Sequence, residues 1–337
     1  MTVVNDFIDP GVRETISGFL GDVESELRAA VISPEPLVSE AAAYLVEAGG
    51  KRFRPLVVAL GAEFSEVGRE AAITGREAAI TSAVVMELTH LATLYHDDVM
   101  DEAPMRRGAA SANARWTNSI AVYVGDFLLA RAASLAAGLG EDAVRLQART
   151  LAQLVRGQLA ETVGPRGADP IRHHLRVIED KTACLIATSA RLGGMAAGLP
   201  EHHVTTLDAF GTAIGMAFQL SDDLLDITSE SEQSGKTPGT DLREGVPTLP
   251  ALYALAAGDT GADSRRLREL LSAGPLIDDG LHAEALFLLR ESAALKQAQE
   301  TVHRYAEDAR AHAAALPSGA ARRTLEALCH YIADRNG

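Results

Sequence analysis

The stretch MELTHLATLYHDDVMDEAPMRRG, residues 86–108, decides the fold: it is an apolar, helix-like run whose residues 97–101 read D-D-x-x-D. The same pattern returns at residues 222–226, inside the equally apolar FQLSDDLLD of residues 218–226. A given five-residue window matches this pattern by chance only about twice in ten thousand. Two matches in one chain of 337 residues therefore indicate a common purpose.

The spacing of the outer carboxylates indicates what the motifs bind. An i, i+4 spacing places Asp97 and Asp101 on one helix face, and likewise Asp222 and Asp226. Like charges so placed repel each other, so a cation bound between them would stabilise the helix. Carboxylate oxygens are hard ligands that suit Mg²⁺ shared with a phosphate-bearing substrate. The sequence therefore predicts magnesium-assisted chemistry on a diphosphate.

Almost the whole chain reads as helix, because Ala and Leu recur at spacings of three and four and alternating strand patterns are scarce. The long predicted helices span 71–100, 119–138, 170–192 and 201–229. No shift in composition marks a boundary, so the prediction is one all-α domain over residues 1–337, a large helical bundle with a central apolar cavity. Each acidic motif lies near the carboxyl end of a long helix, and two such ends facing each other would form a charged mouth over that cavity.

Composition limits the possible functions. A formal charge of −15 argues against nucleic-acid binding and requires local basic clusters to attract an anionic substrate. The two cysteines provide neither a disulfide framework nor a metal site. No basic leader and no apolar run long enough for a membrane span are evident, so we expect a cytoplasmic protein without an integral membrane segment.

Basic residues flank the acidic motifs. GGKRFRP, residues 49–55, combines flexible backbone with three cations at the start of a helix, which suits an anion. Further candidates are Arg106 and Arg107 after the first motif, Lys181 and Thr182 in a helix, Gln219 one turn before the second motif, and Lys236 in the loop after it. Each motif alone also fits a solvated helix surface. The order in which these acidic and basic motifs occur along the chain favours a binding site over separate surface clusters.

In these motifs the chain resembles the trans-prenyl diphosphate synthases of the polyprenyl synthetase family, of the medium- to long-chain type. The resemblance is carried by GGKRFRP, the 86–108 stretch, the GD of VYVGDFLLA, the KT of EDKTACL, FQLSDDLLD and the lysine of SGKTPGTD, in the family's order. It implies an all-α isoprenoid synthase fold, a homodimer, and two substrates, an allylic diphosphate and isopentenyl diphosphate.

The resemblance also implies roles for individual residues. Asp97 and Asp101 would hold two Mg²⁺ ions and Asp222 a third, with Asp98 and Asp226 in support. The allylic diphosphate would be contacted by Arg106, Lys181, Thr182, Gln219 and Lys236. The diphosphate of isopentenyl diphosphate would be bound by Lys51, Arg54, His90 and Arg107. Asp97, Asp101, Asp222, Lys181 and Arg106 would form the catalytic set.

This division agrees with the chemistry. The allylic carbon–oxygen bond must break to a carbocation, and metal ions with cationic side chains stabilise the departing diphosphate. The isopentenyl diphosphate must stay intact, so side chains without metal are suited to hold it. Its double bond attacks the cation, a proton is lost to the departing diphosphate, and exclusion of water protects the cation.

Product length follows from the helix before the first motif. The growing tail should pass Ala92 and Thr93, which are five and four residues before Asp97 and are both small, and Thr89 one turn further. Family members that stop at farnesyl diphosphate commonly carry a bulky aromatic residue there. The sequence thus predicts elongation to about seven to nine isoprene units by family likeness, with Phe127 or Leu128 closing the tunnel.

Three alternatives stay open: a synthase that stops at farnesyl or geranylgeranyl diphosphate, a non-catalytic subunit of a heteromeric synthase, and structural roles for single residues. His96, Tyr95, Cys184 and the pair His173 and His174 are interpreted as structural. A terpene cyclase would need N-D-x-x-S-x-x-x-E in place of the second acidic motif, and the chain has no such pattern.

Overall fold

The computed structural model describes residues 7–64, 69–229, 238–258 and 261–335, with the backbone alone for residues 69–73. The chain divides into two compact units. Unit 1 comprises residues 1–153, 184–211 and 312–327, and unit 2 comprises residues 154–183, 212–311 and 328–337. The prediction of one domain stays a prediction.

Unit 1 is helical apart from one short ribbon. Its elements are α1 (Pro10–Ala30), α2 (Pro36–Glu47), α3 (Phe53–Ala62), α4 (Arg69–Met100), β1 (Met105–Arg106), β2 (Ala109–Ala110), α5 (Ala112–Arg115), α6 (Asn118–Gly138) and α9 (Cys184–Ala196). Four helices contribute residues to both units: α7 (Glu141–Val163), α10 (Glu201–Thr228), α16 (Ala293–Ala314) and α17 (Ala320–Asp334).

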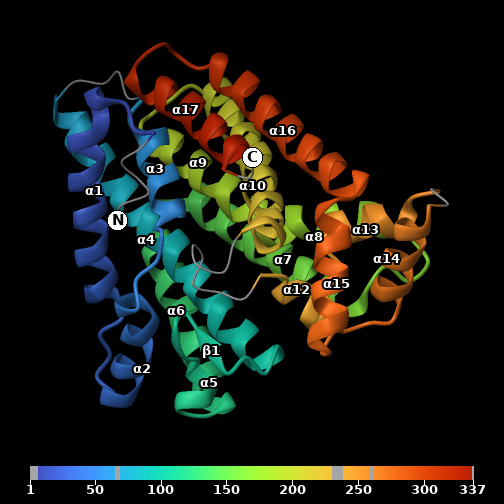
Figure 1. The fold of residues 1–337 in the computed structure, drawn as a ribbon. Helices are drawn as coiled ribbons and strands as arrows, with labels where there is room; N and C mark the ends of the chain where they lie inside the picture. The colour runs from blue at the N-terminus through green and yellow to red at the C-terminus, as the bar shows by residue number, and fades with distance from the viewer. Residues whose placement is uncertain (1–6, 65–68, 230–237, 259–260, 336–337) are drawn as a thin grey trace. The chain divides into compact units, whose positions relative to one another are not determined.

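Helix α4 is the core of unit 1 and packs against α1, α3, α6 and α9 (Figure 1). Leu88, Leu91 and Tyr95 on α4 are fully buried. The α3–α9 pair crosses closely, because a Cβ added at Gly193 would lie 2.3 Å from the carbonyl oxygen of Val58. Burial of these apolar side chains is the main stabilising contribution to this unit.

Unit 2 contains α8 (Pro170–Ile178), the π-helical turn η2 (Glu179–Ala183), α12 (Thr240–Glu244), α13 (Leu249–Ala256), α14 (Ala262–Ser272) and α15 (Asp279–Arg290). Its apolar cluster includes Leu220, Leu224 and Ile227 of α10, which repeat at helical spacing and turn one face inward. Asp169 caps α8 by accepting a hydrogen bond from the Arg172 amide at 2.7 Å, and Pro170 opens the helix.

The predicted all-α class is confirmed, with two local differences. The sequence predicts one helix over 170–192, whereas the structure has α8, the π-helical turn and α9 in succession. The ribbon, with Met105 opposite Ala110 and Arg106 opposite Ala109, was not predicted either. The predicted ends of the two long acidic helices are confirmed, since α4 ends at Met100 and α10 at Thr228.

Two described helices reach the length and mean hydropathy of a membrane span, but length and composition do not distinguish a span from a core helix, so the expectation of no integral membrane segment is not overturned. By length and hydropathy, Thr74–Met100 of α4 and the whole of α6 would suffice. The α4 segment is 67% buried, as a core helix of a folded unit requires, whereas α6 is only 33% buried. Among the exposed apolar side chains of α6 are Val122 and Tyr123.

Candidate active site

The first acidic motif occupies the last turns of α4 in unit 1. Asp97 is half-buried and Asp101 is exposed, while the Asp98 side chain is 0% exposed. Asp98 Oδ1 accepts a hydrogen bond from Nε of Arg106 at 2.6 Å, and its Oδ2 is buried without a hydrogen-bond partner among the described residues. Burial raises the pKa of the Asp98 carboxyl, and Arg106 partly offsets that increase.

A tight turn brings Arg106 back to this carboxylate. Strands β1 and β2 are joined by Arg107 and Gly108, whose φ angles are 52° and 78°. Two successive left-handed residues form a type I′ turn, the loop that matches the twist of a two-stranded ribbon. The turn therefore lets Arg106 bind Asp98 while Arg107 binds the backbone near the start of α3.

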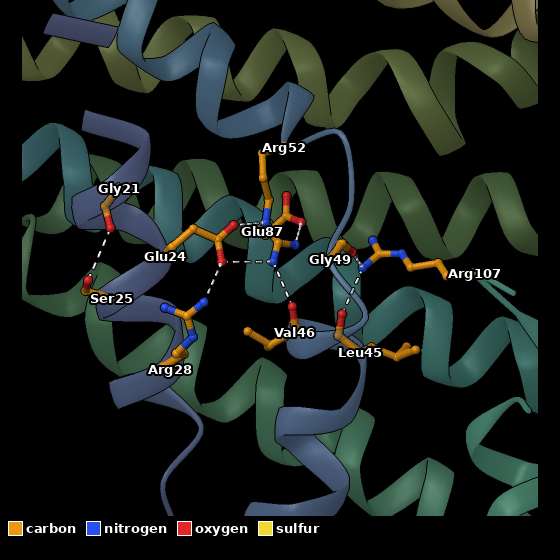
Figure 2. Close-up of polar contacts among 10 residues, drawn as sticks. All are labelled: Gly21, Glu24, Ser25, Arg28, Leu45, Val46, Gly49, Arg52, Glu87 and Arg107. Carbon is orange, nitrogen blue, oxygen red and sulfur yellow. Dashed lines mark hydrogen bonds and ion pairs between the residues drawn. The ribbon is translucent and has the colours of Figure 1, made fainter. Parts of the chain in front are cut away.

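Arg107 docks on the loop before α3 (Figure 2). Its Nη1 donates to the carbonyl oxygen of Leu45 at 2.9 Å and to that of Gly49. A Cβ at Gly50 would lie 3.1 Å from Arg107 Nη2, so the glycine leaves room for the guanidinium. The structure thus joins Arg107 to the GGKRFRP segment, as the prediction of a shared anion site requires.

Arg54 and His90 belong to the same cationic cluster. Burial is the largest effect that lowers the pKa of Arg54, and its Nε has no hydrogen-bond partner among the described residues. The pKa of His90 is held well below its ordinary value, first by burial and then by Arg54 and Arg107. His90 is therefore neutral at pH 7, and one ring nitrogen can donate a hydrogen bond. Lys51, at the edge of this cluster, is exposed.

Arg52, between these residues, has a different environment. It is buried and takes the left-handed conformation before α3, with φ 48°. Its guanidinium binds the carboxylates of Glu24 and Glu87, the latter at 2.8 Å, and the carbonyl of Val46 at 2.9 Å (Figure 2). These contacts tie α1, α2 and α4 together, so Arg52 holds the cluster in place.

The residues predicted to line the product path lie on α4. Ala92 is fully buried and Thr93 is half-buried. The Thr93 hydroxyl donates to the His90 carbonyl at 2.8 Å, and that of Thr89 to the Val85 carbonyl at 2.7 Å. Both hydroxyls are thereby satisfied by their own helix. A hydrocarbon tail beside them would meet no unsatisfied polar atom from these side chains.

The GD pair of α6 supports the first motif through His96. A Cβ at Gly125 would lie 2.2 Å from His96 Nε2, so only glycine accommodates the imidazole as it stands. Asp126 Oδ1 lies 3.4 Å from the same nitrogen, and the Val122 carbonyl lies 3.3 Å away. These contacts fit the prediction that His96 is structural.

The second acidic motif lies in unit 2, on the carboxyl-terminal part of α10. Asp222 Oδ1 pairs with Nη2 of Arg335 at 2.9 Å, and Asp223 Oδ1 accepts from the amide nitrogen of Gln219 at 2.9 Å. The Asp226 carboxylate accepts from the backbone amides of Thr240 and Asp241, each at 3.1 Å. Asp226 therefore anchors the start of α12 beside the motif.

Lys181 and Thr182 lie in the π-helical turn, a geometry that is frequent at functional sites. The preceding residue, Asp180, forms a two-bond ion pair with Arg156, at 2.7 and 2.8 Å. A Cβ at Gly157 would lie 2.9 Å from that of Asp180, so α7 and the turn approach closely. Lys181 Nζ lies 2.5 Å from Glu161, and Thr182 donates to Gln219 at 3.0 Å.

The donor set of both motifs fits Mg²⁺. Among the described residues, no three His, Cys, Asp or Glu side chains are grouped closely enough to hold a metal ion alone. Mg²⁺ needs only one or two protein carboxylates when substrate phosphates complete its shell. In unit 1, Asp97 and Asp101 supply such oxygens in the same motif as the unsatisfied Oδ2 of Asp98, and in unit 2 Asp222 supplies another.

Each unit thus assembles part of the predicted set. Unit 1 groups the first motif with Arg106, and Arg54, His90 and Arg107 in the cationic cluster. Unit 2 groups the second motif with Lys181, Thr182 and Gln219. Lys236 lies outside the described residues, and the facing of the two motifs stays a prediction.

Sequence reasoning missed Arg335. Its side chain is 12% exposed, and besides Asp222 it binds the Ser221 hydroxyl at 2.6 Å and the Phe218 carbonyl at 2.8 Å. The partners lie more than a hundred positions away in the chain, so no local spacing could have identified the contact. Asp241, beside the second motif, was also missed, although it is the last residue of the SGKTPGTD segment.

Comparisons with known proteins agree with this geometry. The family model described as polyprenyl synthetase matches residues 35–281. The chain is 48% identical to a nonaprenyl diphosphate synthase of Mycobacterium tuberculosis, over 94% of this chain and 90% of that protein. It is 39% identical to heptaprenyl diphosphate synthase component 2 of Geobacillus stearothermophilus, over 95% of this chain and 97% of that protein.

A solved structure has the same fold. It is a geranylgeranyl pyrophosphate synthase from Corynebacterium glutamicum complexed with calcium and isoprenyl diphosphate. The TM-score is 0.87 at 44% sequence identity, with 98% of this chain and 99% of that chain covered.

Proposed function

We propose how the residues described above carry out the reaction, on the premise that this chain belongs to the polyprenyl synthetase family. The protein is a trans-prenyltransferase. It condenses an allylic diphosphate with isopentenyl diphosphate and repeats the step to give a long-chain all-trans polyprenyl diphosphate. The observation that carries this function is the pair of D-D-x-x-D motifs, each near the end of a long helix and each beside cationic side chains.

The metal-binding residues are part of the proposal. Asp97 and Asp101 would hold two Mg²⁺ ions and Asp222 a third, and all three would bridge to the allylic diphosphate. When bound, these ions stabilise the negative charge that develops on the diphosphate as the carbon–oxygen bond breaks. Asp98 and Asp226 act in support: the first holds Arg106, and the second anchors the start of α12.

The remaining residues would orient the allylic diphosphate. Lys181, Arg106 and the amide of Gln219 would donate N–H groups to its oxygens. Thr182 fixes the Gln219 amide by donating to its carbonyl oxygen. Lys236 would add a further cation from the loop after α10. Together these groups keep the departing diphosphate in place, where it can accept the proton that the product loses.

Isopentenyl diphosphate would bind the cationic cluster of Lys51, Arg54, His90 and Arg107. The unpartnered Nε of Arg54 and the neutral imidazole of His90 supply donors without a metal. A metal-free site leaves the carbon–oxygen bond of this substrate intact, because nothing there stabilises a leaving diphosphate enough to cleave it.

Incubation of the purified protein with Mg²⁺, farnesyl diphosphate and labelled isopentenyl diphosphate tests this function. The dephosphorylated products are separated by chromatography. We expect products longer than geranylgeraniol, in the range from heptaprenol to nonaprenol that the relatives' names suggest. A clean stop at geranylgeraniol would support the short-chain alternative, which the likeness to a geranylgeranyl pyrophosphate synthase keeps open.

The same assay also tests whether the chain is a subunit of a heteromeric synthase. One similar protein is named as a component of a synthase. A chain that incorporates no label alone, and does so after addition of a partner protein, would be a subunit of such an enzyme. The retention of both acidic motifs and of their basic partners favours independent activity.

We further propose that the enzyme is a cytoplasmic homodimer. Helix α6 supports this assembly, because it is strongly apolar yet only 33% buried, with Val122 and Tyr123 exposed. An exposed apolar face of this kind is stabilised when a second copy covers it. Sedimentation equilibrium distinguishes the dimer from a monomer.

A further inference from the structure

Unit 2 contains a cavity of about 360 Å³ bordered by α8, the π-helical turn and α10. Lys181, Thr182 and Gln219, all proposed to serve the allylic diphosphate, line it. Two other side chains of the same wall, His174 of α8 and Asp223 of α10, have no role in the proposed mechanism. The cavity therefore contains a histidine and an aspartate to which the proposed mechanism gives no role.

The amide of Gln219 is fixed from both ends. Its carbonyl oxygen accepts from the Thr182 hydroxyl at 3.0 Å, and its nitrogen donates to Asp223 Oδ1 at 2.9 Å. An ionised carboxylate only accepts hydrogen bonds, so the amide nitrogen must be the atom that faces Asp223. The orientation of Gln219 in the cavity thus depends on where the Asp223 carboxylate points.

His174 lies at the other oxygen of this carboxylate. Its Nε2 is 3.7 Å from Asp223 Oδ2, and the side chains are 16% and 11% exposed. That nitrogen is buried, and none of the described residues forms a hydrogen bond with it. A buried, unsatisfied ring nitrogen aimed at a carboxylate oxygen is unfavourable until a bond forms. A movement of less than 1 Å, roughly, would bring the pair within hydrogen-bond distance.

We propose that His174 is a positioning residue for the allylic diphosphate site, an inference that rests on the proposed function. Nε2–H of His174 binds Asp223 Oδ2 while Gln219 binds Oδ1, so both oxygens of the carboxylate face donors. A diphosphate that enters the cavity then meets the Lys181 ammonium and the second N–H of Gln219. With both of its oxygens bound, Asp223 does not direct its charge at the diphosphate; of the other carboxylates in the lining, Glu161 and Asp241, the first is paired with Lys181.

The effect of His174 is specific to the allylic substrate. Without His174, Asp223 is free to rotate, Gln219 loses its fixed orientation, and the negative charge of Asp223 is directed at the diphosphate. Isopentenyl diphosphate, assigned to the cluster around Arg54 and His90, gains nothing from this pair. Its KM should therefore be insensitive to His174.

The test compares His174→Phe, which keeps a ring without a donor, with His174→Gln, whose amide reaches the position of Nε2. His303→Phe on α16 is the matched control, since His303 is exposed and serves no proposed site. Binding of farnesyl thiodiphosphate with Mg²⁺ is measured by titration calorimetry. The KM for each substrate is measured separately, and circular dichroism checks folding.

We expect His174→Phe to weaken analogue binding and raise the allylic KM about tenfold, with the isopentenyl diphosphate KM within about twofold of wild type. His174→Gln should stay within about threefold and His303→Phe should match wild type. In an Asp223→Ala background, His174→Phe should add less than about a twofold effect. An undiminished effect there would mean direct contact with the substrate and would overturn the positioning role.

Wild-type binding and turnover in His174→Phe would overturn the inference and leave the proposed function intact. A wild-type protein that neither binds the analogue nor elongates would contradict the proposed function itself. If His174→Phe does not fold, His174→Asn replaces it, because the Asn amide reaches the place of Nδ1 and not that of Nε2. Equal behaviour of the Asn and Gln variants would then overturn the inference.

Discussion

The middle carboxylates of the two acidic motifs, Asp98 and Asp223, are each bound by a neighbouring side chain. Asp98 pairs with Arg106, and Asp223 accepts a hydrogen bond from Gln219. Each of these partners is also a proposed ligand of the allylic diphosphate. At the scale of the residue, the middle carboxylates orient groups that bind substrate, and the proposed metal ligands are Asp97 and Asp101 of the first motif and Asp222 of the second.

Substitution of a metal ligand tests this division. Asp97→Ala should lower kcat at least about a hundredfold, because one Mg²⁺ ligand is lost and the leaving diphosphate is less stabilised. Asp142→Ala, which removes an exposed carboxylate on α7, should leave kcat unchanged. Steady-state kinetics at saturating Mg²⁺ provide the measurement. Normal turnover of Asp97→Ala would show that this aspartate holds no essential ion.

His90 gives a prediction on pH. Its pKa is lowered in the folded state, so above about pH 6.5 both folded and unfolded chains carry the neutral imidazole. Below that pH the unfolded chain binds a proton that the folded chain does not, and stability falls as pH falls. Between pH 7.5 and 5.5, His90→Asn should lose about 1 kcal/mol less stability than wild type. Urea denaturation at both values measures the difference, and parallel losses would contradict the assignment.

At the scale of the element, close helix crossings hold the site in place. The backbone of α3 meets that of α9 where a Cβ at Gly61 would lie 2.9 Å from the Ala190 carbonyl, and one at Gly193 closer still to Val58. Helix α3 begins at the segment that carries Lys51 and Arg54, and α9 continues the turn that carries Lys181. The crossing therefore fixes the position of α3, and with it the segment that carries Lys51 and Arg54, within unit 1.

Gly193→Ala should destabilise the protein by about 1–3 kcal/mol, because the added methyl group meets a backbone carbonyl that has little room to move. Gly21→Ala on α1 is the control. Its Cβ would meet nothing within 4 Å, so helix propensity alone should stabilise the protein by about 0.5–1 kcal/mol. Thermal and urea unfolding give both values. A Gly193→Ala protein as stable as wild type would mean that the helices separate without cost.

The sequence predicted those features of the fold and site that neighbouring residues in the chain determine. Short motifs in the sequence were enough to predict where α4 and α10 end. They were also enough to identify the cations before α3 and the Lys181–Thr182 pair. The π-helical turn was missed because its cause is tertiary: Asp180 is held by Arg156, twenty-four residues earlier. The ribbon was missed because Arg-Gly is not the usual sequence of a type I′ turn. His174 was interpreted as structural, since a histidine beside Leu175 gives no sign of a carboxylate on another helix.

At the scale of the whole molecule, the chain carries a net charge of −15 and acts on substrates that are themselves anionic. The local grouping of cationic side chains explains how an acidic protein can bind anionic substrates. Arg54, Arg106 and Arg107 belong to one unit and Lys181 to the other, each beside buried or hydrogen-bonded neighbours. Cationic side chains are grouped where the diphosphates are proposed to bind, although the chain as a whole is acidic.

Product length is also a property of the whole molecule, because the tail must fit along its interior. Thr93→Phe places an aromatic ring at the proposed path and should shorten the products, with geranylgeraniol or farnesol replacing the long alcohols. Thr93→Val adds no bulk and removes only a hydroxyl that is bonded to its own helix, so it should leave the distribution unchanged. Chromatography of the dephosphorylated products measures both variants. Long products from Thr93→Phe would mean that the tail takes another course.

A crystal structure with Mg²⁺ and farnesyl thiodiphosphate tests the proposed function most directly. We expect metal ions on Asp97, Asp101 and Asp222 that all bind one diphosphate, with Arg106, Lys181 and Gln219 in contact with its oxygens. A diphosphate bound at only one motif, or bound at both without metal, would contradict it.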